Sequence, residues 1–352
     1  MPDRPQLIDE PAMFVLAKDE AAEVTELIKR LLAIFPSAEG IEFLRALALQ
    51  SHDLPERLRA FLLGMRSQEV AAAFLISGFS VDDDSIGPTP HGWGKQLDRY
   101  STSAETVWLG LCGSVLGDLF GWATQQDGAI VHDIAPTRRD EHSQVGSSSA
   151  ELLWWHTEEA FHPLKCDYLG LMCLRNHDRV ATTFASMQGM ELAAEVRRVL
   201  FEKRFVIRPD DSHLTQRHDR GWPTGKEGQL LSAARQRIDQ MNENPPRAAL
   251  LFGDFDSPYL SIDPFYMEVP AEDTQACHAF EVLCNALDGR LREVPLSPGD
   301  VLFIDNYRAV HGRKAFRARY DGTDRWLKRI NIARDLRRSR AHRVTSDSRV
   351  IY

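Results

Sequence analysis

Apolar residues near the beginning of the chain recur three or four positions apart, which is the spacing of one face of an α-helix. In the first such stretch the residues on this face are Ala21, Val24, Leu27, Ile28, Leu31 and Leu32. Residues 41–65 are again rich in helix formers, and a further helix is predicted to begin at Ser103. A short apolar run at 71–81 predicts a strand between them. We therefore expect residues 1–125 to be largely helical.

Beyond residue 125 the pattern changes to short apolar runs separated by turn residues. The predicted strands are 130–134, 166–174, 182–186, 205–207, 259–262 and 301–304. One amphipathic helix, at 271–288, interrupts them. This pattern is typical of a β-sandwich or a barrel, so we expect a β core over 126–335 within a single domain that spans 1–352.

A polar stretch at 208–230 shows no periodicity, and it is long for a plain connection between two elements. A lid over a binding site and an exposed surface loop fit this composition equally well. Both interpretations stay open at this point.

Charge and cysteine content favour a protein that acts on small molecules. The 352 residues include 51 acidic and 42 basic side chains, and the net charge is −9. Binding to a nucleic-acid backbone needs clustered positive charge instead. Because no apolar run is long enough to cross a membrane and no secretory signal is recognisable, we expect a cytoplasmic protein without a membrane partner. Five cysteines without a C-x-x-C pair indicate reduced thiols, and the pattern specifies no oligomeric state.

The strongest chemical signal is the motif His156-Thr157-Glu158. Residues two apart on a strand point to the same face, so the imidazole and the carboxylate would lie together. His311 directly follows the predicted strand 301–304 and can supply a third ligand. Two histidines and one carboxylate on one face are the ligands of non-haem iron(II) oxygenases. The alternative is a histidine packed beside Trp154 and Trp155, with Glu158 as a surface carboxylate.

Two arginines follow at the spacing that carboxylate binding would need. In the segment from Arg325 to Asn331, charged and apolar residues alternate, so Arg325 and Arg329 share one strand face while Trp326 and Lys328 share the other. A guanidinium group donates two parallel hydrogen bonds to a carboxylate. The two arginines therefore suit two anionic small molecules, although a solvent-facing basic strand would show the same pattern.

Other common chemistries find little support. The chain has no glycine-rich nucleotide loop, no G-x-S-x-G elbow and no H-E-x-x-H zinc helix. Two alternatives from other classes remain. One is a zinc enzyme that uses the same three ligands, and the other is a non-catalytic jelly-roll protein that only binds a ligand.

Several longer motifs resemble those of a known family. They are Phe120-Gly-Trp-Ala-Thr-Gln125-Gln-Asp-Gly128, Trp155-His-Thr-Glu-Glu-Ala-Phe161, Phe205-Val-Ile-Arg-Pro-Asp-Asp-Ser212-His213, Phe303-Ile-Asp-Asn306 and Arg325-Trp-Leu-Lys-Arg-Ile-Asn331. The chain beyond about residue 70 resembles the clavaminate synthase-like iron(II)/2-oxoglutarate oxygenases. Within that family it is most similar to the branch that hydroxylates free L-arginine and L-lysine.

This resemblance implies a mainly β fold with flanking helices around a double-stranded β-helix core, the jelly roll of the cupins. It implies iron(II) on His156, Glu158 and His311, with dioxygen and 2-oxoglutarate as cosubstrates and ascorbate as a support in vitro. Arg325 would bind the distal carboxylate of 2-oxoglutarate together with Thr182, for which the neighbouring Thr183 is an alternative. The products would be succinate, carbon dioxide and a hydroxylated amino acid for assembly of a peptide antibiotic.

On the substrate side, the resemblance places Gln125 and Arg329 at the amino and carboxylate groups of the amino acid, and it places Ser212 at the start of a lid. Glu158 is retained, whereas related halogenases replace this carboxylate. Hydroxylation is therefore expected.

The predicted substrate depends on one substitution. Arginine hydroxylases of this family carry two aspartates in a Val-Asp-Gly-Asp context, whereas this chain has Asp263 followed by Phe265 at the second position. One carboxylate beside an aromatic ring suits the compact ammonium group of lysine better than a guanidinium group. We therefore predict hydroxylation of free L-lysine at C3 or C4, with L-arginine 3-hydroxylation as the alternative. Asp254 or Asp256 would supply the missing carboxylate in that second case.

Overall fold

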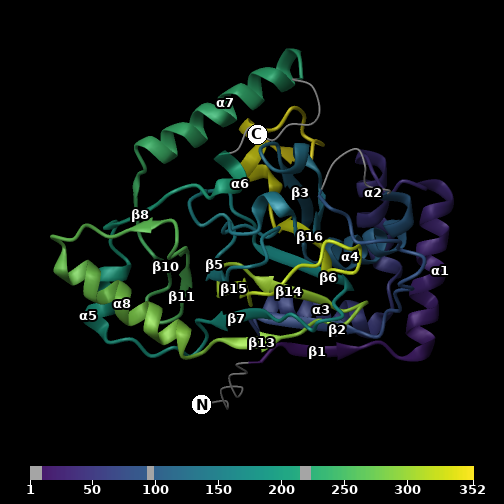
Figure 1. Cartoon of the computed structure of the whole chain (residues 1–352), viewed down its shortest axis with the longest axis horizontal. Helices are drawn as coiled ribbons and strands as arrows, with labels where there is room; N and C mark the ends of the chain where they lie inside the picture. The colour runs from purple at the N-terminus through teal and green to yellow at the C-terminus, as the bar shows by residue number, and fades with distance from the viewer. Residues whose placement is uncertain (1–9, 93–98, 215–222) are drawn as a thin grey trace.

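The computed structural model describes residues 10–92, 99–214 and 223–352. It has a mainly β fold with flanking helices, as predicted, in which a larger sheet and a smaller sheet share an apolar interior (Figure 1). In their order of pairing, the described strands of the larger sheet are β1 (Ala12–Val15), β2 (Ala73–Ser77), β14 (Val301–Asp305), β6 (Tyr168–Arg175), β16 (Trp326–Ala333), β3 (Asp118–Trp122) and β17 (Val350–Ile351), and β4 (Val131–Ile134) also pairs with β16.

The smaller sheet carries part of the candidate metal site. Its strands pair in the order β13 (Arg292–Val294), β7 (Thr182–Ser186), β15 (Ala309–Arg313) and β5 (Leu153–His156). Two short sheets accompany it, and their strands are β12 (Met267–Glu268), β8 (Phe205–Ile207) and β9 (Arg247–Ala248) in one and β10 (Leu251–Gly253) and β11 (Pro258–Leu260) in the other.

Helices cover both outer faces of this arrangement (Figure 1). The described α-helices are α1 (Lys18–Ile34), α2 (Ile41–Gln50), α3 (Glu56–Gln68), α4 (Ser103–Leu116), α5 (Ala194–Leu200), α6 (Asp211–Leu214), α7 (Gly225–Glu243) and α8 (Thr274–Asp288). The first four lie with the larger sheet, while α5 and α8 lie at the opposite end of the molecule and α7 crosses the top of the view.

Three apolar clusters hold these layers together. Leu171, Leu302 and Leu327 of the larger sheet meet Phe184 of the smaller sheet in the interior. On the outer face of the larger sheet, residues such as Phe303 and Ile330 pack against α1–α4. On the far side, Ala185 of β7 and Val310 of β15 pack with Leu200 of α5 and Leu283 of α8. The central strands β6, β7, β14 and β15 thus bury both faces, and the site between the sheets is built on rigid elements.

Much of the predicted secondary structure is confirmed. The N-terminal helices form, strand 71–81 contains β2, and the predicted strands 182–186 and 205–207 coincide with β7 and β8. The predicted helix 271–288 is α8, which begins at Thr274 because the Asp273 side chain accepts a hydrogen bond of 3.0 Å from the Ala276 backbone N–H. However, β1 and β3 were not predicted, and together with β2 they give the larger sheet three strands from residues 1–125.

The polar stretch 208–230 is not one continuous loop. It begins at the end of β8, contains α6, and runs into the first turn of α7, while residues 215–222 lie outside the described part of the chain. Helix α7 was not predicted, because Gly225 and Gly228 lower its helix propensity and its buried stripe is narrow. Leu231, Ala234 and Ile238 make up most of that stripe.

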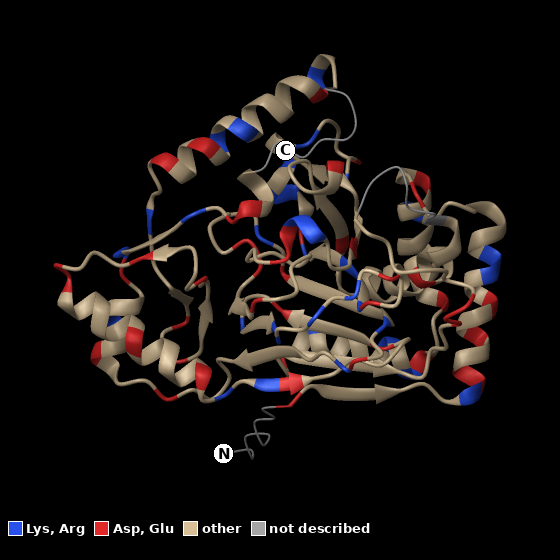
Figure 2. Cartoon of the chain, in the orientation of Figure 1, with Lys and Arg blue, Asp and Glu red and all other residues tan. Residues whose placement is uncertain are grey.

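In the part of the chain that the structure describes, no helix is long and apolar enough to cross a membrane. Figure 2 shows acidic and basic side chains interspersed along α1 and α7, so neither helix presents a face of one charge.

Gly170 tests how tightly the larger sheet packs against its helices. It pairs with Phe303 on one side and with Ile330 on the other, and a Cβ atom here would lie 2.8 Å from a carbon of each side chain. Gly170→Ala should therefore lower the free energy of unfolding by about 1–3 kcal/mol, measured by urea denaturation. The matched control is Gly64→Ala in α3, where a Cβ atom meets nothing within 4 Å and the change should stabilise by about 0.5–1 kcal/mol. Equal effects at both positions would contradict this packing.

Candidate metal centre and the pocket around it

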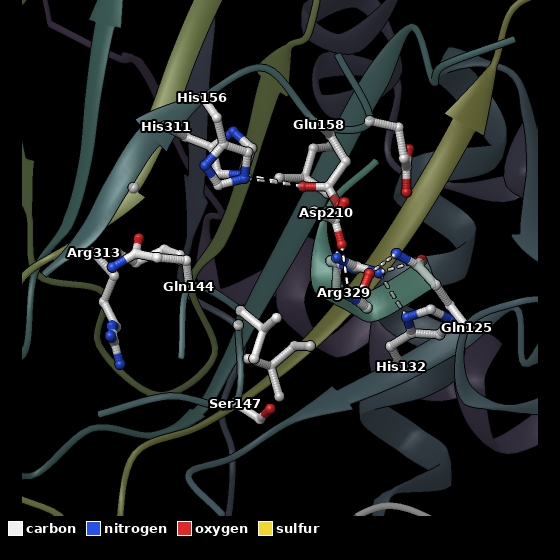
Figure 3. Close-up of a pocket in the computed structure, with 18 of the residues that line it drawn as sticks. Gln125, His132, Gln144, Ser147, His156, Glu158, Asp210, His311, Arg313 and Arg329 are labelled. Atoms are coloured by element: carbon white, nitrogen blue, oxygen red, sulfur yellow. Dashed lines mark hydrogen bonds and ion pairs between the residues drawn. The ribbon is translucent and has the colours of Figure 1, made fainter. Parts of the chain in front are cut away.

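Two paired strands bring the predicted metal ligands together. His156 ends β5 and lies directly opposite His311 of β15 in the antiparallel register, and Glu158 follows two residues after His156. The Glu158 Oε2 atom is 3.2 Å from His311 Nε2 and 3.8 Å from His156 Nε2. One ligand atom from each of the three residues lies within 4.8 Å of the others, so the group can hold a metal ion (Figure 3). Two imidazoles and one carboxylate suit iron(II).

Neighbouring groups fix the orientation of these ligands. His156 Nδ1 lies 2.8 Å from the Trp154 carbonyl oxygen, which can only accept, so Nδ1 carries the proton and Nε2 keeps its lone pair for a metal. Asn306 holds the backbone of Glu158 at two points, because its Oδ1 accepts from the Glu158 N–H at 2.6 Å and its Nδ2 donates to the Glu158 carbonyl at 3.0 Å. The motif is thus held rigid before a metal binds.

Arg329 of β16 lies against the carboxylate of Glu158. Its Nη1 is 2.5 Å from Glu158 Oε1, while its Nη2 donates to Gln125 Oε1 at 2.9 Å and to His132 Nδ1 at 2.8 Å (Figure 3). Its Nε atom is buried and has no partner among the described residues. Burial opposes the charged form of Glu158, but the guanidinium of Arg329 and the contacts with His156 and His311 together outweigh it and hold the pKa of this carboxyl well below its usual range. Glu158 is therefore ionised, with Oε2 facing the histidines.

Arg325 is a second buried cation, and it faces the same interior as Arg329. It is 8% exposed, its Nη2 donates to Thr182 Oγ1 at 3.0 Å, and its Nε atom has no partner among the residues that the structure describes. No carboxylate of the described chain forms an ion pair with it, and burial lowers its pKa to about 10. Such a group is poised to accept an anionic ligand. Thr182 lines the pocket beside it, and its neighbour Thr183 points to the other face of β7.

The strand pattern predicted for these arginines is therefore correct. Lys328 lies on the opposite face of β16, where its Nζ is 3.0 Å from Asp133 Oδ1, and the Trp326 indole N–H donates to the same oxygen at 2.8 Å. The alternative of a solvent-facing basic strand fails, because β16 lies between β6 and β3 and both of its faces are covered.

The other end of the pocket carries two carboxylates. Asp263 is 9% exposed and accepts the backbone N–H groups of Phe265 and Tyr266 at 3.2 and 3.3 Å. Asp210 lines the same pocket just before α6, where its Oδ1 accepts the Ser212 N–H at 2.8 Å. Burial, with a contribution from the negative charge of Asp210, raises the pKa of Asp263 to about 6. This end of the pocket therefore favours a cation.

Phe265 lines this end of the pocket and is also open to solvent on one side. Its side chain is 53% exposed, and its ring packs edge-on against Tyr266 at a centroid distance of 5.0 Å. The aspartates considered as replacements lie elsewhere, in the turn between β10 and β11. There Asp254 Oδ1 accepts the backbone N–H of Asp256 at 2.9 Å, and the Asp256 side chain is 93% exposed. Neither of these two aspartates lines the pocket.

Four residues of this site had been given no role from the sequence. Asn306 and Asp210 stood inside motifs that had been recognised, so a signal existed for both. His132 and Arg313 gave none, because their importance depends on tertiary contacts. Arg313 is buried beside the pocket and donates to the Glu151 carbonyl at 2.9 Å, which holds the loop before β5 in place.

Comparison with known proteins agrees with this geometry. The family model described as taurine catabolism dioxygenase TauD, TfdA family matches residues 112–331. The enduracididine β-hydroxylase of Streptomyces hygroscopicus is 45% identical over 96% of this chain and 98% of its own length. The L-ornithine/L-arginine 3-hydroxylase of Catenulispora acidiphila is 44% identical over the same shares, whereas the L-lysine 3-hydroxylase of that organism is 27% identical over 97% of this chain and 88% of its own.

A solved structure extends the likeness to the whole fold. The non-haem iron oxygenase OrfP, in complex with Fe, succinate and (3S)-hydroxy-L-Arg, has a TM-score of 0.91 and 42% identity, and the alignment covers 97% of this chain and 99% of that one. The expected family, enzyme class and cofactors are thereby confirmed. This chain belongs to the TauD/TfdA family of dioxygenases, among its clavaminate synthase-like iron(II)/2-oxoglutarate oxygenases.

Proposed function

We propose that this enzyme hydroxylates C3 of a free basic L-amino acid, with L-arginine and L-ornithine ahead of L-lysine. The observation that carries the proposal is the pair of arginines, buried Arg325 and partly buried Arg329, beside the His156, Glu158 and His311 cluster. Each offers an unpartnered Nε–H group to the interior, so the site is suited to two carboxylates at once. One belongs to 2-oxoglutarate and the other to the amino acid.

In this proposal, the three ligands hold iron(II), and Arg325 with Thr182 binds the distal carboxylate of 2-oxoglutarate. When bound, the metal and its cosubstrate activate dioxygen to replace one C–H bond by C–OH, while 2-oxoglutarate leaves as succinate and carbon dioxide. The chain's own task is to aim the substrate. Asn306 keeps Glu158 fixed during this reaction, and the covered sheet faces keep water out of the interior.

Gln125 and Arg329 bind the α-amino and α-carboxylate groups of the amino acid. Since Arg329 also contacts the metal ligand Glu158, an α-carboxylate held there places the first carbons of the substrate nearest to the metal. This arrangement favours C3 over carbons further along the side chain. The names of the relatives that are 44–45% identical, a β-hydroxylase and a 3-hydroxylase, support the same position.

The prediction of L-lysine is not favoured. It assumed a single carboxylate at the far end of the pocket, but Asp210 and Asp263 both line this end. Two carboxylates suit the wide fork of a guanidinium group, and Phe265, which lines the same end, is half-exposed and leaves both carboxylates in the pocket. The relatives named as L-lysine hydroxylases are also more distant, at 25–27% identity.

We also infer that residues 126–335 form a jelly-roll core within one oxygenase domain over 1–352, and that the enzyme acts in the cytoplasm. The facing sheets and the TM-score of 0.91 over 97% of the chain support a single domain. We further propose that the hydroxylated amino acid is used to assemble a peptide product.

Mass spectrometry of amino acids tests the proposed reaction. Purified enzyme is incubated in air with iron(II), ascorbate, 2-oxoglutarate and either L-arginine, L-ornithine or L-lysine. We expect a gain of about 16 mass units at C3 of arginine or ornithine, together with succinate, and slower change of lysine. A gain on lysine alone would restore the lysine interpretation. Without product or succinate the protein would be a ligand-binding jelly roll, and turnover without 2-oxoglutarate would indicate a zinc enzyme.

Asp210→Asn tests the second carboxylate. Because a charged hydrogen bond contributes about 1.5–3 kcal/mol, the variant should raise the KM for L-arginine about tenfold or more and leave the KM for 2-oxoglutarate unchanged. Asp256→Asn is the matched control, since this exposed side chain lies outside the pocket. An unchanged KM for arginine in Asp210→Asn would mean that Asp263 alone binds the cation.

Arg325→Met separates ligand binding from stability. The variant should lose 2-oxoglutarate binding at least tenfold, because the lost bonds are charged. The metal-free protein should nevertheless become more stable by about 1 kcal/mol or more in urea unfolding, since a buried cation without a carboxylate partner is removed.

The control for Arg325→Met is Lys328→Met on the other face of the same strand. It leaves Asp133 buried without its cation, and should cost about 3–5 kcal/mol. If Arg325→Met destabilised the metal-free protein as strongly as Lys328→Met, Arg325 would be a structural cation rather than an anion-binding group.

A further inference from the structure

His213 is a buried histidine in α6 that the proposed reaction does not use. It is 5% exposed, and its ring lies edge-on to Phe161 at a centroid distance of 5.2 Å and to Trp122 at 6.0 Å. Its Nδ1 is 2.7 Å from Thr124 Oγ1, and its Nε2 is 3.1 Å from Gln125 Nε2. The Glu159 Oε1 atom is 3.9 Å from His213 Nε2, which is too distant for a hydrogen bond.

The protons of this group can be assigned from Arg329. A guanidinium group only donates, so the Gln125 atom that faces Arg329 Nη2 at 2.9 Å must be the amide oxygen. The amide nitrogen of Gln125 then faces α6, where it donates to Ser212 Oγ at 2.7 Å and to His213 Nε2. His213 Nε2 must therefore be unprotonated, and Nδ1–H donates to Thr124. Burial, which lowers the pKa of His213, agrees with a neutral ring.

We propose that His213 is a positioning residue: by accepting a hydrogen bond from the Gln125 amide, it keeps the amide oxygen on Arg329 and makes substrate binding depend on the seating of α6. This inference rests on the proposed function, in which Gln125 and Arg329 bind the amino acid. Without the His213 acceptor, one of the two Gln125 N–H groups loses its partner, so the amide is held less firmly and can turn over to present its N–H groups to Arg329. Two donors would then face each other, and the grip on the substrate would weaken.

The position of α6 strengthens this coupling, because the helix spans both ends of the pocket. Its first residue, Asp211, donates its backbone N–H to Tyr266 Oη at 3.3 Å, beside the loop that carries Asp263. Asp210, directly before α6, lines the pocket at the end that favours a cation. When His213 is seated between Trp122 and Phe161, the same short segment places Asp210 at one end and orients Gln125 at the other. Both ends of the amino acid are then bound only with α6 in place.

Three substitutions at one position test this role. In His213→Gln the side-chain amide reaches the position of Nε2 and can accept from Gln125, whereas in His213→Asn it reaches only the position of Nδ1 near Thr124. His213→Ala removes both contacts. We expect the dissociation constant for L-arginine to rise about tenfold in the Asn and Ala variants and to stay close to that of the unmodified protein in the Gln variant. Binding is measured by calorimetry without oxygen, in the presence of iron(II) and 2-oxoglutarate.

The affinity for 2-oxoglutarate should stay unchanged in all three variants, because Arg325 and Thr182 do not contact α6 in the described chain. His278→Ala, an exposed histidine of α8, is the matched control and should bind L-arginine as the unmodified protein does. If His213→Ala does not fold, the Gln and Asn variants carry the test, since both keep a polar side chain at this position.

The outcomes separate the two proposals. Unmodified protein that binds none of L-arginine, L-ornithine and L-lysine would contradict the proposed function and this inference with it. Tight binding in the unmodified protein together with an Asn variant of equal affinity would contradict the role of His213 alone. Equal losses of L-arginine affinity in the Gln and Asn variants would also overturn this role. The affinity would then depend on the shape of the imidazole ring and not on the acceptor atom Nε2.

Discussion

The contact between Arg329 and Glu158 is the interaction on which the rest of the site depends. It commits one carboxylate oxygen, Oε1, to a guanidinium group at 2.5 Å and leaves Oε2 for the two histidines. A cation buried this deeply needs acceptors on several sides, and here they come from separate elements: Gln125 after β3, His132 on β4 and Glu158 after β5. The same contact joins the metal ligands to the arginine that is proposed to bind the substrate carboxylate. The first carbons of a substrate bound to Arg329 therefore lie nearest to the metal.

The fold supplies this interior by covering both faces of β16. Lys328 points toward the helices and is neutralised by Asp133, whereas Arg325 and Arg329 point toward the smaller sheet. Of these two arginines, Arg329 has a carboxylate partner among the described residues and Arg325 has none, so the charge on Arg325 is available for a ligand. Because the two sheets are held by apolar layers on their inner and outer sides, these charges stay in place without solvent.

The parts of the site that could be predicted from the sequence are those that follow from the spacing of residues within one strand. His156 and Glu158 are two residues apart on an extended segment, and alternation along β16 separates Arg325 from Trp326. Asp210 could not be assigned in this way, because its closeness to Asp263 arises from tertiary folding. For the same reason the substitution at Phe265 was given too much weight: the half-exposed ring does line the pocket, but so does a carboxylate from a distant segment, Asp210. Helix α7 was not predicted, because its glycines lower the helix propensity and its buried apolar stripe is narrow.

The central claim is that two arginines, Arg325 directly before β16 and Arg329 within it, bind two different carboxylates beside one metal ion. Its most direct test is a crystal structure of the enzyme grown without oxygen in the presence of iron(II), 2-oxoglutarate and L-arginine. The account predicts the metal on His156, Glu158 and His311, the distal carboxylate of 2-oxoglutarate on Arg325, and the amino-acid carboxylate on Arg329. Electron density with both carboxylates on one arginine, or with Arg325 facing no ligand, would contradict it.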